Sequence, residues 1–524
     1  MASDYKGIAE ENIKKYGTDI DRYGNVLLAK LYSDHTHFVY ELLQNAEDAR
    51  AKWVEFHLFK DRLEVRHNGR RFNDNDIRGI CGLVEGTKKE DLTQIGKFGI
   101  GFKSVYAYTC TPKIYSGNEA FYIEHYVRPF SIESIDIKNN ETLFIFPFNH
   151  SEVSSAKAFK EISERLHKLN SRTLLFLNNI EKINWNINGE ESGAYIRKTK
   201  HRKRQVRKVY VISEIGSQKD NEKWLIFERP VSDTTGLKVE VAFKIGKKED
   251  KTKKEIIIPA DNSSVVVFFP TEKETHLKFL IQGPYQTTPA RDNIPKENEW
   301  NRRLIKETAL LVADSIPKVK ELELLTVDFL NMLPISEDDF PEDHMFRPIY
   351  DAVLNKLKSD EKLLPATDGG YMSAKQAFLG RGADLIKLLE SDQLSLLFGK
   401  DKAQWLSSDI TQDKTPGLRD YLIYKLNVTE VTPEKFANQF TEEFIKEQSD
   451  EWVVRFYVFL KGQRALWKEK YKSLRNKPFI RLEDGTHVSP FNLSEKPRAY
   501  LSGDLGDYSY AIVKRTITED EQAR

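Results

Sequence analysis

The chain has 524 residues, 31% of them charged, and a formal net charge of +1. This length predicts roughly three domains of about 150 residues each, and the balanced charge indicates neither nucleic acid nor a membrane as a partner. Two cysteines exclude a disulfide framework and a cysteine-based metal site, and the absence of a signal peptide or of an apolar run near ~18 residues predicts a cytoplasmic protein without a membrane span.

The first informative element is a helix that begins after Ser33-Asp34 and carries Glu41 and Asn45. These two residues are one turn apart, so both project from the same face, and the apolar residues lie on a different stripe. A carboxylate can take a proton from water and an amide oxygen can bind Mg²⁺, so the pair suits a hydrolytic site. The alternative is an ordinary solvent-facing Glu with an Asn in mid-helix.

Two strands are predicted next, at Trp53–Leu58 and Arg62–Val65, because apolar and polar residues alternate along both segments. They are followed by Arg66-His67-Asn68-Gly69, whose Asn-Gly pair favours a structural turn.

A glycine-rich loop follows a polar segment and precedes FKSVYAY, which is predicted to begin a helix. Gly96, Gly99 and Gly101 let the backbone approach an anion, the helix N-terminus offers free N–H groups, and Lys103 adds a charge that could reach a phosphate. The order of these features does not fit a dinucleotide fold, and no P-loop motif is present.

Taken in order, ELLQNAEDA, HNGRRF and IGKFGIGFKSVY resemble the GHKL superfamily of ATPases, and the wording is most similar to the sacsin-like and HtpG-like branches. The resemblance implies that Glu41 activates water, that Asn45 holds Mg²⁺ and that Thr142 helps to bind adenine. It implies an ATP lid between Gly82 and Gln94. It also implies phosphate contacts along the glycine loop, at Gly96, Lys97, Phe98, Gly99, Ile100, Gly101, Phe102 and Lys103.

One position departs from the family pattern. The second motif usually carries an Asp that accepts the adenine amino group, whereas here this position is His67, followed by Asn68 and Gly69. A neutral histidine can accept one hydrogen bond, depending on its tautomer. Adenine selectivity is therefore a weaker expectation than phosphate binding, and a purely structural turn at Asn68-Gly69 is compatible with both.

The remaining expectations for the first domain, residues 1–171, concern its packing. Further strands are predicted at 113–116, 120–125 and 142–148 and a closing helix at 157–170, which together make a Bergerat-fold α/β sandwich. Cys81 and Cys110 are both expected to be buried. The polar helix expected within residues 1–24 could reach a partner in a homodimer, as in GHKL dimers, or simply pack or fray as a chain terminus.

A second, β-rich α/β domain is predicted for residues 172–320, from short apolar runs that begin at Leu174–Leu177. It contains a basic run, Tyr195–Lys208, for which a solvated hairpin is favoured over a nucleic-acid patch because aromatic residues are sparse. Near its end, Thr288, Arg291, Trp300 and Asn301 match a stretch of the sacsin-like proteins. The resemblance implies that Arg291 contacts the γ-phosphate, with a surface pair between Arg291 and Asp292 as the alternative.

Residues 321–524 are predicted to be mostly helical, with two similar hairpins at Leu363–Phe378 and Pro478–Leu493. Their Asp-Gly pairs are expected to be turn residues. The chain as a whole is therefore expected to be α+β, and larger relatives suggest that it is an N-terminal fragment.

Three functions remain open from the sequence. The first is Mg²⁺-dependent ATP hydrolysis that drives a conformational switch, in a chaperone-like machine or in the sensor of a larger protein, for which antiviral defence is one setting. The second is a nucleic-acid-binding clamp of the MORC or MutL kind. The third is a scaffold that binds nucleotide without turnover, which His67 keeps open.

Overall fold

The computed structural model describes residues 2–18, 20, 35–82, 101–138, 140–201, 205–249, 252–261, 263–288, 293–467, 474–492, 494–501 and 511–524. These residues form two compact units. The first comprises Met1–Ser315 with Asp339–Ile349, and the second comprises Ile316–Asp338 with Tyr350–Arg524. The division expected between residues 171 and 172 falls inside the first unit and stays a prediction.

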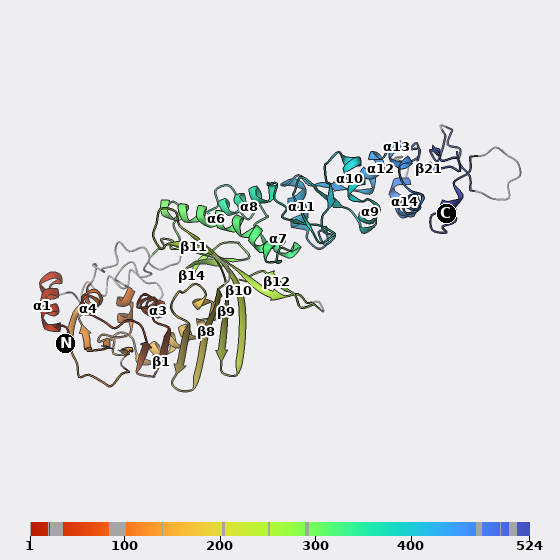
Figure 1. The fold of residues 1–524 in the computed structure, drawn as a ribbon. Helices are drawn as coiled ribbons and strands as arrows, with labels where there is room; N and C mark the ends of the chain where they lie inside the picture. The colour runs from red at the N-terminus through yellow and green to blue at the C-terminus, as the bar shows by residue number, and fades with distance from the viewer. Residues whose placement is uncertain are drawn as a thin grey trace. The chain divides into compact units, whose positions relative to one another are not determined.

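The first unit is built on one mixed sheet, in which fifteen strands are found among the described residues. The strands of its N-terminal part are β1 (Trp53–Leu58), β2 (Arg62–His67), β3 (Lys113–Ser116), β4 (Glu119–Glu124), β5 (Arg128–Ser131) and β6 (Thr142–Pro147). The later strands are β7 (Lys182–Ile187), β8 (Glu191–His201), β9 (Val206–Ile215), β10 (Gln218–Pro230), β11 (Lys238–Lys247), β12 (Glu255–Ile258), β13 (Ser264–Val267), β14 (Phe269–Glu274) and β15 (Leu280–Gln282). The long strands β8, β9 and β10 lie side by side (Figure 1).

Strand β7 joins the two groups of strands. It pairs in parallel with β1, from Trp53 opposite Lys182 to Leu58 opposite Ile187. Because β1 also pairs with β2, the sheet continues without interruption from the predicted first domain into the predicted second one.

Six helices in the described part of the first unit share a core with the N-terminal strands: α1 (Tyr5–Tyr16), α3 (Phe38–Asp48), α4 (Asp74–Cys81), η2 (Gly101–Ala107), α5 (Ser155–Lys168) and η3 (Ser171–Leu174). The same part of the unit also contains η1 (His35–His37) and the first part of α6 (Glu299–Glu321), whose Glu307 pairs with Arg229 of β10. The buried residues Leu42 and Leu43 of α3 belong to the same core as Val54 and Phe56 of β1. Full burial of each such side chain stabilises the fold by about 1.5–3 kcal/mol. Buried and partly exposed residues alternate along β1 and along β2, so one face of each strand packs against the helices. The result is the expected α/β sandwich, and the α+β class is confirmed.

The helix expected after the glycine loop is present at residues 101–107 as a 3₁₀ helix, in a segment whose Val105 and Tyr106 have low α-helix propensity. Two other local expectations were wrong. Residues 174–177 do not form a strand: Leu174 ends the 3₁₀ helix η3, and the side chains that follow it supply two different cores. Cys110 is exposed, whereas Cys81 is buried as expected.

Helix α1 packs against its own unit. The Tyr5 hydroxyl donates a hydrogen bond of 2.6 Å to Glu119 at the start of β4, and the Asn12 amide donates one of 2.7 Å to the Val127 carbonyl. The described N-terminal residues therefore form a packed terminus in this chain.

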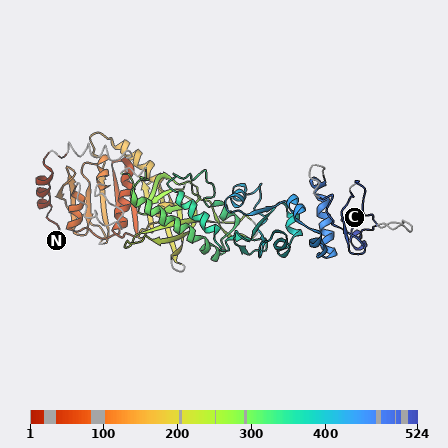
Figure 2. The ribbon, with the colours of Figure 1, turned by 90° about the horizontal axis from the view of Figure 1, so that it is seen from above.

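The second unit is mainly helical, as predicted, and its helices can be followed in Figure 2 in cyan to blue. Short β-ladders lie between these helices along the chain. Its helices are the last part of α6, α7 (Val327–Met332), α8 (Arg347–Lys358, which begins in the first unit), α9 (Ala383–Leu388), α10 (Ser391–Phe398), α11 (Pro416–Tyr424), α12 (Pro433–Gln439), α13 (Glu442–Lys446), α14 (Asp450–Gly462), η4 (Arg464–Trp467) and α15 (Arg515–Thr518). Its strands are β16 (Leu364–Pro365), β17 (Tyr371–Met372), β18 (Ala377–Gly380), β19 (Gln404–Trp405), β20 (Thr429–Val431), β21 (Ile480–Arg481) and β22 (His487–Val488). None of the helices in the described part of the chain is long and apolar enough to cross a membrane.

The two predicted hairpins are confirmed and use the same turn chemistry. Strands β16 and β17 are joined by a turn in which the Asp368 carboxylate accepts a hydrogen bond from the Gly370 amide. Strands β21 and β22 are joined by a turn in which Asp484 accepts from the Thr486 amide. Gly369 and Gly485 have φ angles of 84° and 81°, which explains the glycine after each aspartate.

Candidate active site on helix α3

The end of the glycine loop meets the carboxylate of Glu41. A Cβ atom placed on Gly101 would lie 1.9 Å from Glu41 Oε2 and 2.6 Å from Glu41 Cδ. Only a residue without a side chain allows this approach. The structure therefore brings together two residues that lie far apart in the sequence and that the motifs predict to share one site.

His37 lies on the other side of this carboxylate. Its Nε2 is 3.4 Å from Glu41 Oε1, and the two side chains are 12% and 14% exposed. No sequence motif marks His37, although it lies one helical turn before Glu41, the same spacing that separates Glu41 from Asn45. Glu41 is thus held between an imidazole and a glycine backbone, in a largely enclosed position.

Asn45 lies one turn further along α3 and is partly buried. Within the described residues its side-chain amide makes no hydrogen bond, and its backbone carbonyl accepts from the Ala49 amide at 2.9 Å. The amide oxygen therefore has capacity for a ligand, and oxygen is the donor that Mg²⁺ prefers. No cluster of three or more His, Cys, Asp or Glu side chains in the described part of the chain could hold a metal alone. Asn45 could therefore serve as one oxygen ligand of a magnesium ion whose other ligands are phosphate and water oxygens.

His67, Asn68 and Gly69 form the end of β2 and its connection. The Gly69 amide donates to His67 Nδ1 at 3.0 Å, and Asn68 Oδ1 accepts from the Lys52 and Trp53 amides at 2.8 and 3.1 Å. A Cβ atom on Gly69 would lie 2.7 Å from that of Ala49 in the turn that ends α3. Asn68 and Gly69 therefore have the structural role that the turn interpretation predicts, and they position His67 beside the end of α3.

The His67 ring is 3% exposed, and burial lowers its pKa to about 4. Thr142 lies directly opposite His67 in the register of β2 and β6 and is fully buried. The hydroxyl oxygens of Thr142 and Ser116 are 2.6 Å apart, and Ser116 also accepts from the Phe72 amide at 3.0 Å. His67 and Thr142 are thus adjacent, as both predicted base contacts require.

Phe102 and Lys103 lie in the interior. Phe102 is 6% exposed and packs near Phe144 and Phe146. The Lys103 ammonium is 2% exposed and donates to the Ile80 carbonyl at 2.6 Å and to the Tyr126 carbonyl. Burial lowers the pKa of Lys103 to about 8. A contact between Lys103 and a phosphate requires the ammonium to leave these carbonyls, and it stays a prediction.

Several predicted positions lie outside the described residues. They are Gly96, Lys97, Phe98, Gly99, Ile100, the lid from residue 83 to 94, and Arg291. The base of the Arg291 loop is nevertheless described. The Thr288 amide donates to the Asn293 carbonyl at 3.0 Å, and the Asn301 side chain both donates to and accepts from the backbone of Gln286. The Trp300 indole donates to the Pro284 carbonyl at 2.9 Å. Trp300 and Asn301 thus serve to hold this loop.

Glu47 is a buried carboxylate that the sequence analysis missed. Its oxygens accept from the amides of Asn178, Asn179 and Ile180 at 2.7–2.9 Å, and it is 3% exposed. These amides immediately precede β7. The available signal was its position on the apolar stripe of α3, one turn after Leu43. Glu47 ties the helix that carries Glu41 to the strand that joins the two parts of the sheet.

The basic run at Tyr195–Lys208 forms the hairpin of β8 and β9, as expected. Several of its charges contact groups inside the unit. Arg197 donates to the Ile180 carbonyl, Arg207 donates to Glu228 at 2.8 Å, and Lys208 donates to Glu255 at 3.0 Å. Residues 202–204 lie outside the described residues. The described contacts give no particular support to a nucleic-acid interface.

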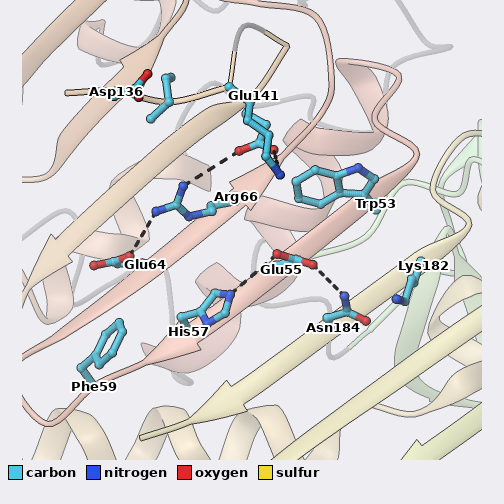
Figure 3. Close-up of a pocket in the computed structure, with 12 residues that line it drawn as sticks. Trp53, Glu55, His57, Phe59, Glu64, Arg66, Asp136, Glu141, Lys182 and Asn184 are labelled. Carbon is cyan, nitrogen blue, oxygen red and sulfur yellow. Dashed lines mark hydrogen bonds and ion pairs between the residues drawn. The ribbon is translucent and has the colours of Figure 1, made fainter. Parts of the chain in front are cut away.

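A hollow of about 770 Å³ lies on the opposite face of the sheet from α3. Figure 3 shows that its charged side chains pair with one another: Arg66 lies between Glu64 and Glu141, and Glu55 contacts His57 and Asn184. These residues alternate along β1 and β2 with those that face α3. The hollow is therefore separate from the site around Glu41.

Comparisons with known proteins identify relatives of the kind that the motifs indicate. Residues 63–124 match the model of the Sacsin domain family. The chain is 25% identical over 454 residues to the protein NO VEIN of Arabidopsis thaliana, an alignment that covers 78% of this chain and 16% of that protein. It is 24% identical over 386 residues to human sacsin, covering 53% of this chain and 8% of sacsin.

The chaperone protein HtpG of Helicobacter hepaticus is 26% identical over 124 residues, which cover 18% of this chain and 20% of HtpG. The chain thus spans at most about a fifth of the length of these relatives. The matches confirm the resemblance given by the motifs. The N-terminal part of this chain is therefore similar to sacsin and to HtpG, the relatives that the motifs indicate.

Proposed function

We propose that this region binds ATP with Mg²⁺ and hydrolyses it, and that hydrolysis drives a conformational switch. The observation that carries the proposal is the convergence of Glu41 with Gly101, where the backbone at the end of the glycine loop approaches the carboxylate within contact distance. A carboxylate next to a backbone without a side chain is the arrangement that lets a terminal phosphate and its attacking water sit beside a general base.

In this proposal Glu41 orients the attacking water and takes its proton, while His37 helps to fix the carboxylate. Asn45 holds the magnesium ion, whose positive charge, when bound, offsets the negative charge that develops on the phosphates. Arg291 would contact the terminal phosphate from the loop held by Trp300 and Asn301. The lid at residues 82–94 would close over the nucleotide and exclude other water.

The same helix provides a route for the switch. Glu41 and Glu47 both belong to α3, and Glu47 binds the three amides that precede β7. A small displacement of α3 on hydrolysis would therefore move the segment that leads into the long strands. The relation to the chaperone HtpG favours a chaperone-like use of this motion, and the proposal includes a homodimer formed through the N-terminal domain.

The proposal is tested by two substitutions in the full chain. Glu41→Ala should retain Mg²⁺–ATP binding and lose turnover by a factor of about 10² or more, whereas Asn45→Ala should weaken Mg²⁺–ATP binding. Binding is measured by isothermal titration and turnover by phosphate release. Glu164→Ala, which removes an exposed carboxylate on α5, is the matched control and should change neither.

Full hydrolysis by purified Glu41→Ala would overturn the role assigned to this carboxylate. Tight ATP binding without any turnover by the natural chain would instead identify a nucleotide-binding scaffold.

A further inference from the structure

The hydrogen bonding of His67 determines which of its ring nitrogens carries the proton. A neutral imidazole has one donor nitrogen and one acceptor nitrogen. The Gly69 amide donates to Nδ1 at 3.0 Å, so Nδ1 is the acceptor and Nε2 carries the hydrogen. Burial keeps the ring neutral by lowering its pKa to about 4. His67 therefore presents an N–H donor, and it has no remaining capacity to accept a hydrogen bond.

The position of His67 relative to α3 places this donor at the far end of a bound nucleotide. Gly69, which holds the His67 ring, contacts Ala49, and Ala49 follows Glu41 by two helical turns. At about 1.5 Å per residue, this separation is roughly 12 Å along the helix. If the terminal phosphate lies at Glu41 and the magnesium ion at Asn45, the group beside His67 is the base.

The Nε2 donor is available to a ligand. Among the described residues, the hydrogen bond of the ring is the one from Gly69 to Nδ1, and no acceptor is found for Nε2. A ligand that offers an acceptor here can form a hydrogen bond with Nε2–H. A ligand that offers a second donor would leave two donors facing each other, so it is disfavoured.

We infer that His67 makes this site recognise a purine through an acceptor at position 6 of the base, so that guanosine and inosine triphosphates bind at least as tightly as ATP. The inference rests on the proposed nucleotide function. Guanine and hypoxanthine carry an oxygen acceptor at this position, whereas adenine carries an amino donor that would face the Nε2 donor. Adenine could meet His67 only through a ring nitrogen, with its amino group displaced.

The test compares the Mg²⁺ salts of ATP, GTP and ITP by isothermal titration with the full chain. GTP and ITP should each bind at least as tightly as ATP. ITP separates the effect of the 6-oxygen from that of the guanine 2-amino group, which it lacks. In His67→Asp the carboxylate is acceptor-only and can still accept from the Gly69 amide. This variant should shift the ratio of ATP to GTP affinity toward ATP by roughly tenfold or more.

His67→Gln is the second variant, because its amide can present either a donor or an acceptor and should bring the two affinities close together. The inference is overturned if the natural chain binds ATP tenfold more tightly than both GTP and ITP, whatever the variants do. It is also overturned if folded His67→Asp leaves the ratio unchanged. If no nucleoside triphosphate binds at all, the proposed function itself fails and the inference fails with it.

Discussion

The two ends of helix α3 carry carboxylates in contrasting surroundings. Glu47 is 3% exposed and accepts hydrogen bonds from three consecutive backbone amides. Glu41 lies between His37 and the backbone of Gly101, next to Asn45, whose amide makes no hydrogen bond within the described residues. A carboxylate whose acceptor capacity is met by the fold stabilises that fold. An amide that keeps hydrogen-bonding capacity, as Asn45 does beside Glu41, is arranged for a ligand.

Other polar residues divide in the same way. Lys103 resembles Glu47, because its ammonium donates to two backbone carbonyls inside the unit. His67 resembles Asn45, because one ring nitrogen is held by Gly69 and the other is left for a ligand. The contrast therefore predicts losses of stability at Glu47 and losses of function at the residues around Glu41.

The largest expected effect is the loss of the Glu47 carboxylate. Glu47→Ala should lower the free energy of unfolding by about 4 kcal/mol, because three amides near β7 lose their acceptor in a buried place. Urea unfolding measures this change. Glu181→Ala removes a carboxylate in the next segment whose side chain is 58% exposed, and it should cost less than about 0.5 kcal/mol. If both variants lost the same free energy of unfolding, the hydrogen bonds of Glu47 would not contribute specially to stability.

A second effect concerns pH. Burial lowers the pKa of His67 from its ordinary value of 6.5 to about 4 in the folded chain, so the unfolded chain takes up this proton first as the pH falls. Stability should therefore decrease between about pH 6.5 and pH 4, by about 3 kcal/mol for this group.

The same pH titration of urea unfolding in His67→Asn isolates this contribution. His344 and His487 also have lowered pKa values from burial, so they add to the slope in both proteins and cancel in the comparison. A natural chain and variant with the same pH dependence would show that His67 is not a buried neutral imidazole.

Gly101→Ala probes the approach of the glycine loop to Glu41. The added methyl group would displace the carboxylate, so turnover should fall by about tenfold to a hundredfold. Steady-state phosphate release measures the loss. Gly79→Ala in α4 is the matched control, because a Cβ atom there meets nothing within 4 Å. Unchanged turnover in folded Gly101→Ala would show that Glu41 is not positioned by this glycine.

The smallest expected effect sharpens the contrast from the other side. Glu41→Gln should change the free energy of unfolding by less than about 1 kcal/mol, since the amide keeps the size of the side chain and its oxygen can still accept a hydrogen bond. The measurement is the same urea titration used for Glu47→Ala. A loss as large as that of Glu47→Ala would make Glu41 a structural residue.

Much of the N-terminal part could be predicted from local pattern. Alternating apolar residues identify β1 and β2, and the spacing of Glu41 and Asn45 identifies their shared face of α3. The Asp-Gly pairs identify both C-terminal hairpins, because a positive φ favours glycine wherever the turn occurs. These features depend on residues close together in the chain, so the sequence carries the information directly.

Other features depend on contacts between distant segments. The parallel pairing of β1 with β7 and the binding of residues 178–180 by Glu47 join parts of the chain that no local pattern connects. The burial of Lys103 was missed because a lysine after a glycine loop is expected to reach outward, whereas here carbonyls of Ile80 and Tyr126 are within reach. Cys110 differs from Cys81 only in its surroundings.

The sequence by itself determined the motifs, the strands and helix that carry them, and therefore the resemblance to the GHKL superfamily. Only the tertiary structure decided which polar side chains the fold itself satisfies and which tautomer His67 adopts. The physical reason is that hydrogen-bond capacity is a property of the surroundings: a residue type sets how many partners a side chain can have, and the packing of distant segments decides whether those partners are present.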